Sequence, residues 1–592
     1  MPHPSSEKVL LLPQPRICTW TNDAVSRRVL DHVVSRIDPQ AMPHEQGYRL
    51  HITSEKGVQI IGHDDAGVFY AQQTLKQMVA TNHALLCSVT IEDWPDFKVR
   101  GAMLDVSRDR VPTMETLLEN IDRLASWKIN QIHLYVEHTI AYQGHEAVWK
   151  DSSPLTLEEI TILDKHCQSL HIDFVPSQNL FGHLHPWLST EGYKHLAECP
   201  DGWKSAWGAQ YSGPFSLNPT DPASLDLVSD LVSQLASCCD SKFFNINCDE
   251  TFDVGQGKSK AACDEKGRAT VYLDFLNEIC DQVHQHGKTP LFWGDIVLHH
   301  PELIDRVPKN AVLLNWGYEA NHPYMEQTRK FHEAGVRQYV CPGTSTWRSL
   351  TGRHDNAIEN LRSAAEAGLK YNAEGYLITD WGDHGHWHPF VFSWPGLAYG
   401  AAVSWSYNTN AAHRDTAGWL NTHVFHDATG YFGQALRDLG QLYELDERED
   451  DVATWWFDFL RHTTGELGTG EWKPISPAGA GRVLERLNKI EAMFNQAQPS
   501  CKDADLLTRE VSWIMRLTRW MADRVHEDSS QKASKSEEWG LNASPEAKAS
   551  FEKIITDYKA LWLERSRPGG LSKSVEKLTQ ITRKGTGVDP CP

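Results

Sequence analysis

The chain has 592 residues, which exceeds a single domain of roughly 100–200 residues. Its formal net charge of −21 argues against nucleic acid or an anionic membrane surface as a partner. No apolar run is long enough to span a bilayer, and the first residues lack a charged segment followed by an apolar core. We therefore expect a cytoplasmic protein of about two or three domains, with a trimmed secreted chain as the alternative.

Residues 1–93 have the pattern of a small α/β domain. Short runs with strand-like composition occur at Val9–Leu12, Tyr48–Ile52 and Gly57–Gly62. The segment Ala66–Val79 instead has the apolar period of a helix. We expect these elements to form an accessory domain that precedes a different, repeating pattern.

In residues 94–405, short runs rich in β-branched and aromatic residues alternate with helical segments such as Leu157–Leu170 and Thr270–His284. Eight runs are expected to be strands, namely Val99–Asp105, Gln131–Glu137, Ile172–Ser177, Phe243–Glu250, Thr289–Asp295, Ala311–Tyr318, Gln338–Gly343 and Gly375–Asp383. Alternating strands and helices indicate a parallel sheet, and this number of units predicts closure into a (β/α)₈ TIM barrel.

Residues 406–592 have the pattern of a C-terminal α-helical region. Apolar side chains recur there on one helical face at Val483, Leu487 and Ile490, and again at Phe551 and Ile555. The predicted fold class is therefore α/β: a TIM barrel with a small N-terminal α/β domain and a helical C-terminal domain.

The most informative strand end carries two adjacent carboxylates, Asp249 and Glu250, after the apolar run Phe243–Cys248. Adjacent acids are common on solvated surfaces, so the pair alone does not indicate an active site. The residues at the other strand ends supply the further evidence. In a TIM barrel these ends meet on one face, where chemistry takes place. The polar and aromatic residues at or just beyond the expected strand ends are Glu137, His183, Asp249, Glu250, Trp293, Asp295, Trp316, Tyr318, Trp347, Trp381 and Asp383.

The tripeptide Trp-Gly-Asp occurs twice among these ends, at 293–295 and 381–383. Sugar rings present flat C–H faces that stack on indoles, and their hydroxyls need carboxylates or arginine as directional partners. A single tryptophan at a strand end would be weak evidence, because many of the 22 tryptophans belong to the core. Several of them beside acids favour a carbohydrate pocket over a packed core.

Other chemistries are less well supported. His384, His386 and His388 alternate and could in principle hold a metal, but no carboxylate or thiol ligands of recognisable spacing accompany them. Cys248 stands beside the acids without an obvious activating base, so we expect a structural thiol. No dinucleotide-binding glycine loop or Ser-His-Asp arrangement is visible. We expect neither a metal nor a cofactor.

Taken in order, several segments resemble glycoside hydrolase family 20, the β-N-acetylhexosaminidases. The segments that carry the resemblance in the barrel are Phe97–Arg108, Gln131–Leu134, Phe181–His183 and Asp249–Glu250. The earlier segments Gly57–Gly62 and Ala66–Leu75 are similar to the accessory domain that the family places before its barrel. The resemblance covers about residues 45–405.

This resemblance implies retaining hydrolysis in which the acetamide oxygen of the sugar attacks the anomeric carbon and no protein nucleophile is needed. By position, Glu250 would be the general acid and base, and Asp249 would orient the acetamide N–H. Neighbours on an extended strand point to opposite sides, which suits this division of roles.

The resemblance also implies a set of substrate-binding residues. Arg100 would grip sugar hydroxyls, and His183 and Glu137 would support the catalytic pair, although the family usually has Asp where this chain has Glu137. The family tyrosine that donates to the acetamide carbonyl has no counterpart in Cys341–Trp347, and Tyr318 is the candidate replacement. The expected binding residues are Arg100, Glu137, His183, Trp293, Asp295, Trp316, Tyr318, Trp347, Trp381 and Asp383.

The sequence thus predicts an exo-acting, retaining β-N-acetylhexosaminidase that removes terminal β-linked GlcNAc or GalNAc from a glycan or glycoconjugate, with a homo-oligomer as one possible assembly. One alternative is a retaining β-glycosidase for sugars without the acetamide, using Asp295 or Asp383 as nucleophile. A second alternative is a non-catalytic glycan-binding protein on a barrel scaffold.

Overall fold

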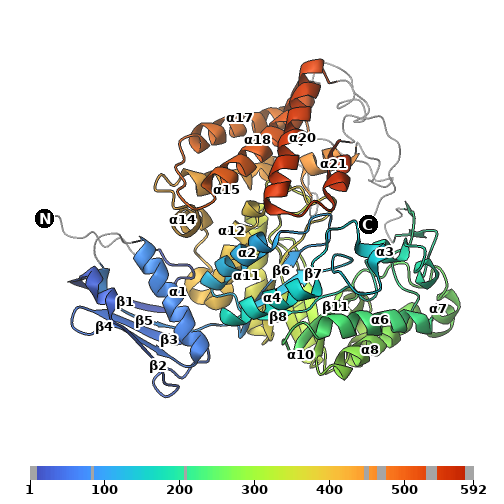
Figure 1. The fold of residues 1–592 in the computed structure, drawn as a ribbon, viewed down its shortest axis with the longest axis horizontal. Coiled ribbons are helices and arrows are strands. Elements are labelled where there is room, and N and C mark those ends of the chain that lie inside the picture. The colour runs from blue at the N-terminus through green and yellow to red at the C-terminus, as the bar shows by residue number, and fades with distance from the viewer. Residues whose placement is uncertain are drawn as a thin grey trace.

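The computed structural model describes residues 10–81, 86–205, 210–445, 453–462, 475–527 and 543–579. Figure 1 shows three parts: a small sheet with one long helix at the N-terminus, a central barrel, and a group of helices formed by the C-terminal part of the chain. In the described part of the chain, no helix combines the length and the apolar character that a membrane span requires.

The N-terminal domain is a five-stranded sheet covered by one helix. Its strands are β1 (Ile17–Val25), β2 (Val33–Ile37), β3 (Tyr48–Thr53), β4 (Gly57–Gly62) and β5 (Leu86–Asp93), in the order β1-β5-β3-β4-β2. Helix α1 (Asp65–Thr81) packs on the apolar face, where Tyr48, Leu50 and Ile52 alternate with less buried neighbours along β3. The expected strand Val9–Leu12 is wrong for residues 10–12, and Val9 lies outside the described residues.

The central domain is an eight-stranded parallel barrel, which confirms the predicted fold class. Its strands are β6 (Val99–Asp105), β7 (Gln131–Tyr135), β8 (Asp173–Val175), β11 (Phe243–Asn247), β12 (Thr289–Trp293), β13 (Val312–Trp316), β14 (Gln338–Cys341) and β15 (Gly375–Asp380). A parallel bridge between Ser177 and Asn245 joins β8 to β11 and completes the ring. All strands except β6 end two or three residues earlier than expected, so many of the predicted site residues stand in loops.

Helices surround the barrel because parallel strands are buried on both faces. The larger ones are α2 (Met114–Ser126), α4 (Leu157–Ser169), α6 (Pro222–Ala236), α8 (Arg268–Gln285), α10 (Tyr324–Glu333), α11 (His354–Lys370) and α12 (Trp394–Trp405). Helix α4 begins with a capping box, in which Thr156 and Glu159 satisfy each other's backbone N–H groups. Shorter elements in the connecting loops of the barrel are α3 (Glu146–Trp149), α5 (His185–Leu188), η2 (Lys194–Leu196), β9 (Trp203–Lys204), β10 (Gln210–Tyr211), α7 (Lys260–Lys266), α9 (Asp295–His299), η3 (Pro301–Arg306) and η4 (Phe390–Phe392). In the N-terminal domain, η1 (Arg27–Asp31) lies between β1 and β2.

A buried charged network joins the N-terminal domain to the barrel. Asp93 at the end of β5 forms an ion pair with Lys128 at 3.0 Å and accepts a hydrogen bond from the Trp405 indole at 2.8 Å. Arg100, the second residue of β6, lies between the rings of Tyr70 and Trp405. The network therefore fixes the accessory domain at the N-terminal end of the barrel, opposite the loops that carry the acids.

The C-terminal part of the chain begins beside the N-terminal segment, where Tyr407 donates its N–H to Asp96. Its later helices pack against the loops at the other end of the barrel, where the N–H of Arg567 donates to the carbonyl of Val111. The C-terminal helices are α13 (Tyr407–Asn410), α14 (Thr416–Leu420), η5 (Asn421–Phe425), α15 (Tyr431–Leu439), η6 (Leu442–Leu445), α16 (Trp455–His462), α17 (Pro477–Phe494), α18 (Ala504–Glu527), α20 (Pro545–Arg565) and α21 (Leu571–Thr579).

Ser574 on α21 donates to the carbonyl of Gly385 and accepts from the Trp387 indole through its own carbonyl. Arg567 donates to Glu159 at the start of α4. The contacts of Ser574 hold the loop that follows β15, and that of Arg567 holds the start of α4.

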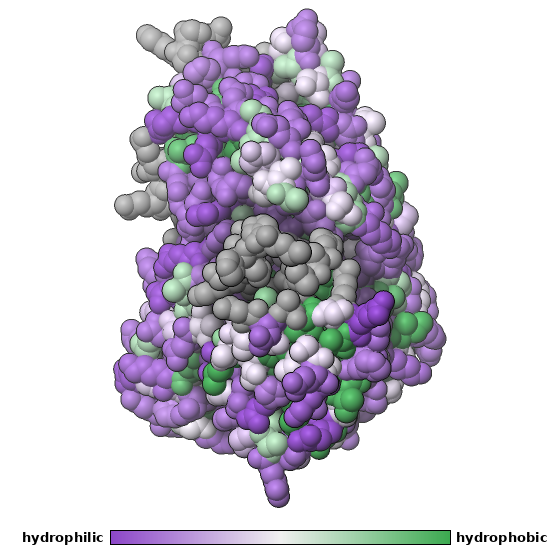
Figure 2. Space-filling view, turned by 90° about the vertical axis from the view of Figure 1, so that its left-hand side faces the viewer, coloured by the Kyte–Doolittle hydropathy of each residue, from purple (hydrophilic) through white to green (hydrophobic). Residues whose placement is uncertain are grey.

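The face of the molecule on the side of the N-terminal domain is mostly hydrophilic, with hydrophobic residues gathered in its lower half (Figure 2). A largely hydrophilic surface agrees with the mean hydropathy of −0.47.

Candidate active site

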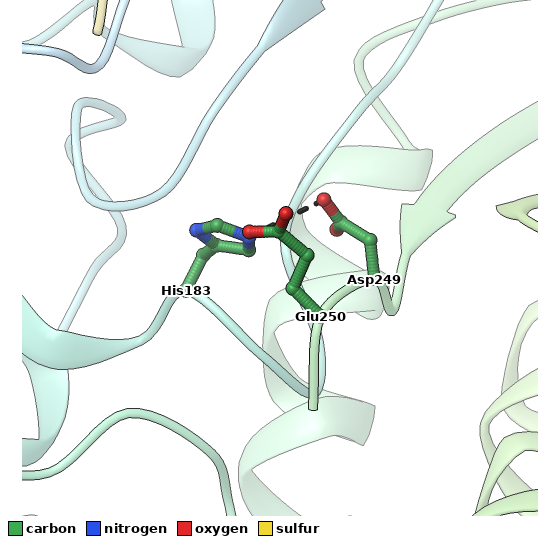
Figure 3. A group of neighbouring side chains, drawn as sticks. All are labelled: His183, Asp249 and Glu250. Atoms are coloured by element: carbon green, nitrogen blue, oxygen red, sulfur yellow. Dashed lines mark ion pairs between the residues drawn. The ribbon is translucent and has the colours of Figure 1, made fainter. Parts of the chain in front are cut away.

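The two carboxylates stand on a sharply turned segment after β11. Asn247, Cys248 and Glu250 all have φ between 54° and 65°, the left-handed region that side-chain-bearing residues rarely adopt. This turn brings Asp249 and Glu250 together around His183 (Figure 3). The Nε2 atom of His183 lies 3.3 Å from Oδ2 of Asp249 and 3.3 Å from Oε2 of Glu250.

His183 is the charged centre of this group. Burial alone opposes its protonation, but the charges of Asp249 and Glu250 outweigh burial and raise the pKa of His183 to about 10. The imidazole is therefore a cation at neutral pH and neutralises part of the acid pair. Its other nitrogen, Nδ1, lies 3.8 Å from Oε1 of Glu137.

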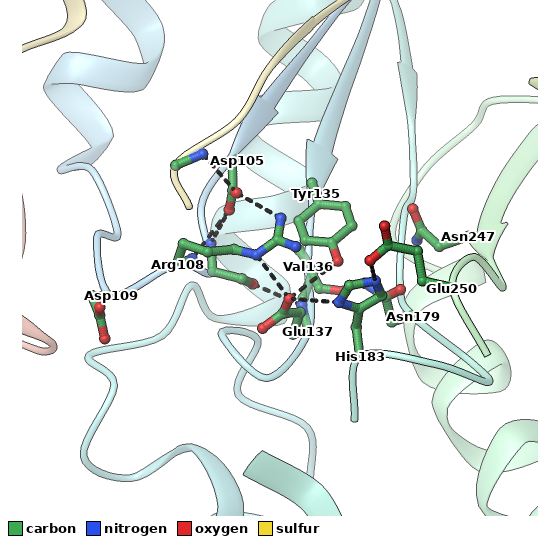
Figure 4. Close-up of polar contacts among 12 residues, drawn as sticks. Asp105, Arg108, Asp109, Tyr135, Val136, Glu137, Asn179, His183, Asn247 and Glu250 are labelled. Atoms are coloured by element: carbon green, nitrogen blue, oxygen red, sulfur yellow. Dashed lines mark hydrogen bonds and ion pairs between the residues drawn. The ribbon is translucent and has the colours of Figure 1, made fainter. Parts of the chain in front are cut away.

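Glu137 links His183 to an arginine that we did not single out from the sequence. The Arg108 guanidinium contacts Glu137 at 3.0 Å and Asp105 at 2.9 Å (Figure 4). Tyr135 donates to Glu137 at 3.1 Å, and the Arg108 guanidinium lies 4.4 Å from the centre of the Tyr135 ring. Burial raises the pKa of Glu137, with Arg108 and His183 opposing it. Arg108 thus belongs to the site. Its position in the sequence just after the end of β6, where site residues of a barrel are expected, could have indicated this.

The position of Arg100 contradicts the expectation that it contacts the sugar. Its side chain is fully buried and donates to the carbonyls of Lys128 at 2.9 Å and Phe97 at 2.8 Å. It lies near the start of β6, whereas the acid pair lies beyond the strand ends. At a rise of about 3.3 Å per residue, Arg100 and Asp105 are about 16 Å apart along the strand. Arg100 therefore stabilises the contact with the N-terminal domain.

Aromatic side chains form the wall and base of the site. The Trp381 indole donates to the Tyr318 hydroxyl at 2.8 Å. Tyr318 stacks on Trp316 with ring centres 5.2 Å apart, and Trp347 meets Tyr318 edge-on at 4.8 Å. Trp316 and Tyr318 are half-buried. Trp293 and Trp347 are almost fully buried, so these two lie deepest.

The predicted residues Asp295 and Asp383 take different positions. Asp295 accepts the backbone N–H of Glu250 at 3.0 Å, and its other carboxyl oxygen is enclosed by protein. In the described structure Asp295 therefore contacts the turn that carries Glu250. Asp383 is half-buried, and burial raises its pKa while Arg108 and Arg348 oppose that shift. Asp383 and Arg108 thus line the same side of the site.

Two further expectations concern metals and thiols. Within the described ranges, the one group of three or more possible ligands is His183, Asp249 and Glu250, whose donor atoms lie within 4.8 Å of one another. His386 and His388 are buried with ring centres 4.8 Å apart, and burial lowers the pKa of both. Because the three grouped donors are also the acid pair and its histidine, proton transfer and metal binding would compete for the same atoms.

The Cys248 thiol is buried and faces the carbonyl of Ile246 at 3.3 Å. Burial raises the pKa of this thiol. A thiol held in its neutral form is a poor nucleophile, which agrees with a structural role for Cys248.

Two family models match the chain. The glycosyl hydrolase family 20 catalytic domain matches residues 97–366, and domain 2 of the same family matches residues 19–94. The first match covers the barrel as far as α11, and the second covers the N-terminal sheet.

Individual relatives agree with these matches. A beta-hexosaminidase of Porphyromonas gingivalis is 26% identical over 291 residues, covering 43% of this chain and 36% of that protein. A lacto-N-biosidase of Bifidobacterium bifidum is 23% identical over 284 residues, covering 46% of this chain and 24% of that protein. This chain therefore spans about a quarter to a third of the length of these two relatives.

A solved structure has the same fold. An exo beta-N-acetylglucosaminidase from Vibrio harveyi, in complex with N-acetylglucosamine, superposes with a TM-score of 0.57 at 17% identity, covering 72% of this chain and 77% of that one. Together with the two family models, these similarities lead to one conclusion. The chain belongs to glycosyl hydrolase family 20.

Proposed function

We propose that this protein is an exo-acting, retaining β-N-acetylhexosaminidase that hydrolyses terminal β-linked GlcNAc or GalNAc with the help of the substrate's own acetamide. The observation that carries the proposal is the pairing of Asp249 and Glu250 around the cationic His183, beside half-buried aromatic side chains. Membership of family 20 supports the same chemistry, since this family uses substrate assistance.

Glu250 suits the role of general acid and base. Its side chain is 39% exposed, whereas that of Asp249 is 10% exposed. Glu250 can therefore reach the glycosidic oxygen and a water molecule, while Asp249 faces a more enclosed part of the site. This difference in exposure suits a substrate whose leaving group lies near the solvent and whose acetamide lies deeper in the site.

Asp249 suits the acetamide N–H. Its Oδ1 atom is buried and has no partner among the described residues. A buried carboxylate oxygen without a donor is costly, and an amide N–H of the substrate would satisfy it. The charge of Asp249 would also stabilise the positive charge that develops on the cyclised acetamide.

The separation of the acids supports retention of configuration. One oxygen of Asp249 and one of Glu250 lie within 4.8 Å of each other. In inverting enzymes the two carboxyl groups flank the sugar about 6.5–9.5 Å apart to admit a water molecule, an arrangement that two neighbours on one turn do not provide. Because Asp249 and Glu250 are neighbours on one turn, neither lies across the sugar from the other, and the acetamide oxygen would supply the nucleophile.

The proposed reaction has two steps. The acetamide oxygen attacks C1 while Glu250 donates its proton to the leaving oxygen, so the glycosidic bond breaks and an oxazolinium ion forms. Glu250 then takes a proton from water, whose oxygen attacks C1 and reopens the ring. The configuration at C1 is restored, and Glu250 regains its proton.

Tyr318 is the candidate donor to the acetamide carbonyl, because Trp381 orients it. The Tyr318 hydroxyl accepts the Trp381 N–H, and burial raises the pKa of Tyr318, so the hydroxyl keeps its own proton. Arg108 and Asp383 are the candidate partners for the outer sugar hydroxyls, with Arg108 in the role first expected of Arg100.

A panel of 4-nitrophenyl β-glycosides tests the proposal. We expect hydrolysis of the 2-acetamido derivatives of glucose or galactose and little or none of the plain sugars. Equal activity on plain β-glucosides would support the alternative retaining β-glycosidase with Asp295 or Asp383 as nucleophile. Binding of the sugars without hydrolysis of any substrate would support the non-catalytic alternative.

A further inference from the structure

The turn that carries the acid pair adopts an unfavourable backbone conformation. Asn247, Cys248 and Glu250 have φ values of 58°, 65° and 54°. Residues with a side chain are disfavoured in this region, so such a turn persists only where surrounding contacts hold it. Those contacts therefore determine the orientation of the Glu250 side chain.

Side chains from two neighbouring elements hold this turn. Tyr272 on α8 donates to the carbonyl of Cys248 at 3.0 Å. Arg268, also on α8, donates to the carbonyl of Thr251 at 2.8 Å. Asp295, at the start of α9, accepts the N–H of Glu250 at 3.0 Å. Of these three bonds, the one made by Asp295 reaches a member of the acid pair directly.

The surroundings of Asp295 favour its neutral form. The residue is 5% exposed, and its Oδ1 atom is enclosed by protein. Burial, followed by the charge of nearby Asp249, raises the pKa of Asp295 well above its usual range. An asparagine side chain closely copies the shape and charge of a neutral aspartic acid and keeps an oxygen that can accept the Glu250 N–H.

We propose that Asp295 is a positioning residue that fixes the direction of Glu250 by accepting its backbone N–H, and that this role requires an oxygen acceptor without a negative charge. The inference rests on the proposed function, in which Glu250 transfers the proton. It assigns Asp295 neither to substrate binding nor to a covalent intermediate.

Two substitutions of Asp295 distinguish the effect of its hydrogen-bond acceptor from the effect of a negative charge. We expect Asp295→Asn to keep kcat within about tenfold of the wild type, because the acceptor remains. Asp295→Ala removes the acceptor, and a displacement of about 1 Å in a reacting group costs about 100-fold in rate. The loss in Asp295→Ala should appear in kcat more than in KM. Asp305→Asn, the same change at an exposed aspartate on η3, is the matched control.

The measurements are kcat and KM on 4-nitrophenyl 2-acetamido-2-deoxy-β-glucoside, the pH–rate profile, and the melting temperature of each variant. In Asp295→Asn both limbs of the pH–rate profile should stay where they are in the wild type, since a neutral group is replaced by a neutral group. A loss above about tenfold in folded Asp295→Asn would show that the charge is needed and would overturn the inference. Unchanged kcat in folded Asp295→Ala would overturn it as well.

If Asp295→Ala does not fold, Asp295→Asn and its pH–rate profile still decide the question. Failure of the proposed function has a different signature, because the wild-type enzyme would then not hydrolyse the 2-acetamido substrate. In that case the same pair of variants is measured on the sugar that the wild type does hydrolyse, and a covalent role for Asp295 would make Asp295→Asn inactive.

Discussion

The Nε2 atom of His183 lies 3.3 Å from Oε2 of Glu250 and equally near Oδ2 of Asp249. A single imidazolium thus contacts both carboxylates of the acid pair, although His183 follows β8 and the acids follow β11. One cation thus compensates two adjacent acids, of which Asp249 is enclosed and Glu250 is more exposed.

The first prediction concerns the general acid. Glu250→Gln keeps the size of the side chain but removes the transferable proton, so we expect a normal fold and a loss of about 10²–10⁴ in kcat on substrates with poor leaving groups. Activated aryl substrates should lose less in the first step, because their leaving groups need little protonation. Near wild-type kcat on a poor leaving group would show that another residue is the acid.

The second prediction concerns the pH dependence of stability. The pKa of His183 is raised to about 10 in the folded protein, compared with about 6.5 for an unperturbed histidine. A histidine whose pKa is higher in the folded state contributes its full stabilisation at pH values below its pKa in the unfolded state. This contribution is lost as the pH rises through its pKa in the folded state. The melting temperature of the wild type should therefore fall relative to that of His183→Asn between pH about 6.5 and about 10.

The measurement is a set of thermal melts of both proteins at fixed ionic strength across this pH range. Wild type and variant should converge as pH approaches the upper limit. A constant difference between the two proteins across the range would contradict a charged His183.

A third prediction compares two arginines of one segment. Arg108→Met should lower kcat/KM on sugar substrates, because its guanidinium lies beside Glu137 and Asp383. Arg100→Met should instead lower the free energy of unfolding by about 1–3 kcal/mol, because buried carbonyls lose their donor. Folded Arg100→Met should retain wild-type KM. The reverse pattern in kinetics and denaturant melts would restore Arg100 as the sugar-binding arginine.

The fourth prediction concerns the aromatic wall. Trp381→Ala should raise KM and lower kcat/KM. The loss in transition-state stabilisation should exceed the roughly 0.5–1.5 kcal/mol of aromatic stacking alone, because the substitution removes the whole indole ring. Trp381→Phe keeps a ring but removes the N–H that orients Tyr318, so it isolates the hydrogen bond. Unchanged kinetics in folded Trp381→Ala would place this indole in the core and outside the sugar site.

The fifth prediction concerns the acetamide mechanism. Asp249→Ala should lose catalysis, and a thiazoline analogue of GlcNAc or GalNAc should inhibit the wild type competitively, because its ring copies the cyclised intermediate. Azide should not rescue Asp249→Ala through an inverted glycosyl azide, as it would for a covalent nucleophile. A glycosyl-enzyme adduct on Asp295 or Asp383, detected by mass spectrometry, would refute the acetamide mechanism.

Much of the barrel could be predicted from the sequence, because its signals are local. Each strand run, such as Gly375–Asp380, is apolar and lies between helical periods, and the parallel arrangement follows from that alternation. The N-terminal sheet was harder. Strands β1 (Ile17–Val25), β2 (Val33–Ile37) and β5 (Leu86–Asp93) were missed. The side chains of β2 are exposed along its whole length, and β1 and β5 pair with each other across a long stretch of chain.

Asp249 and Glu250 could be placed after a barrel strand from the sequence, because strand, turn and acids are adjacent in the chain. The contact of Arg108 rather than Arg100 with this site, and the bond from Asp295 to the Glu250 backbone, became visible in the folded barrel. Both residue types occur in the right segments, but the role of each depends on which distant groups surround it. Those contacts, such as the bond between Asp295 and Glu250 across 45 positions, arise from barrel closure and leave no local pattern in the chain.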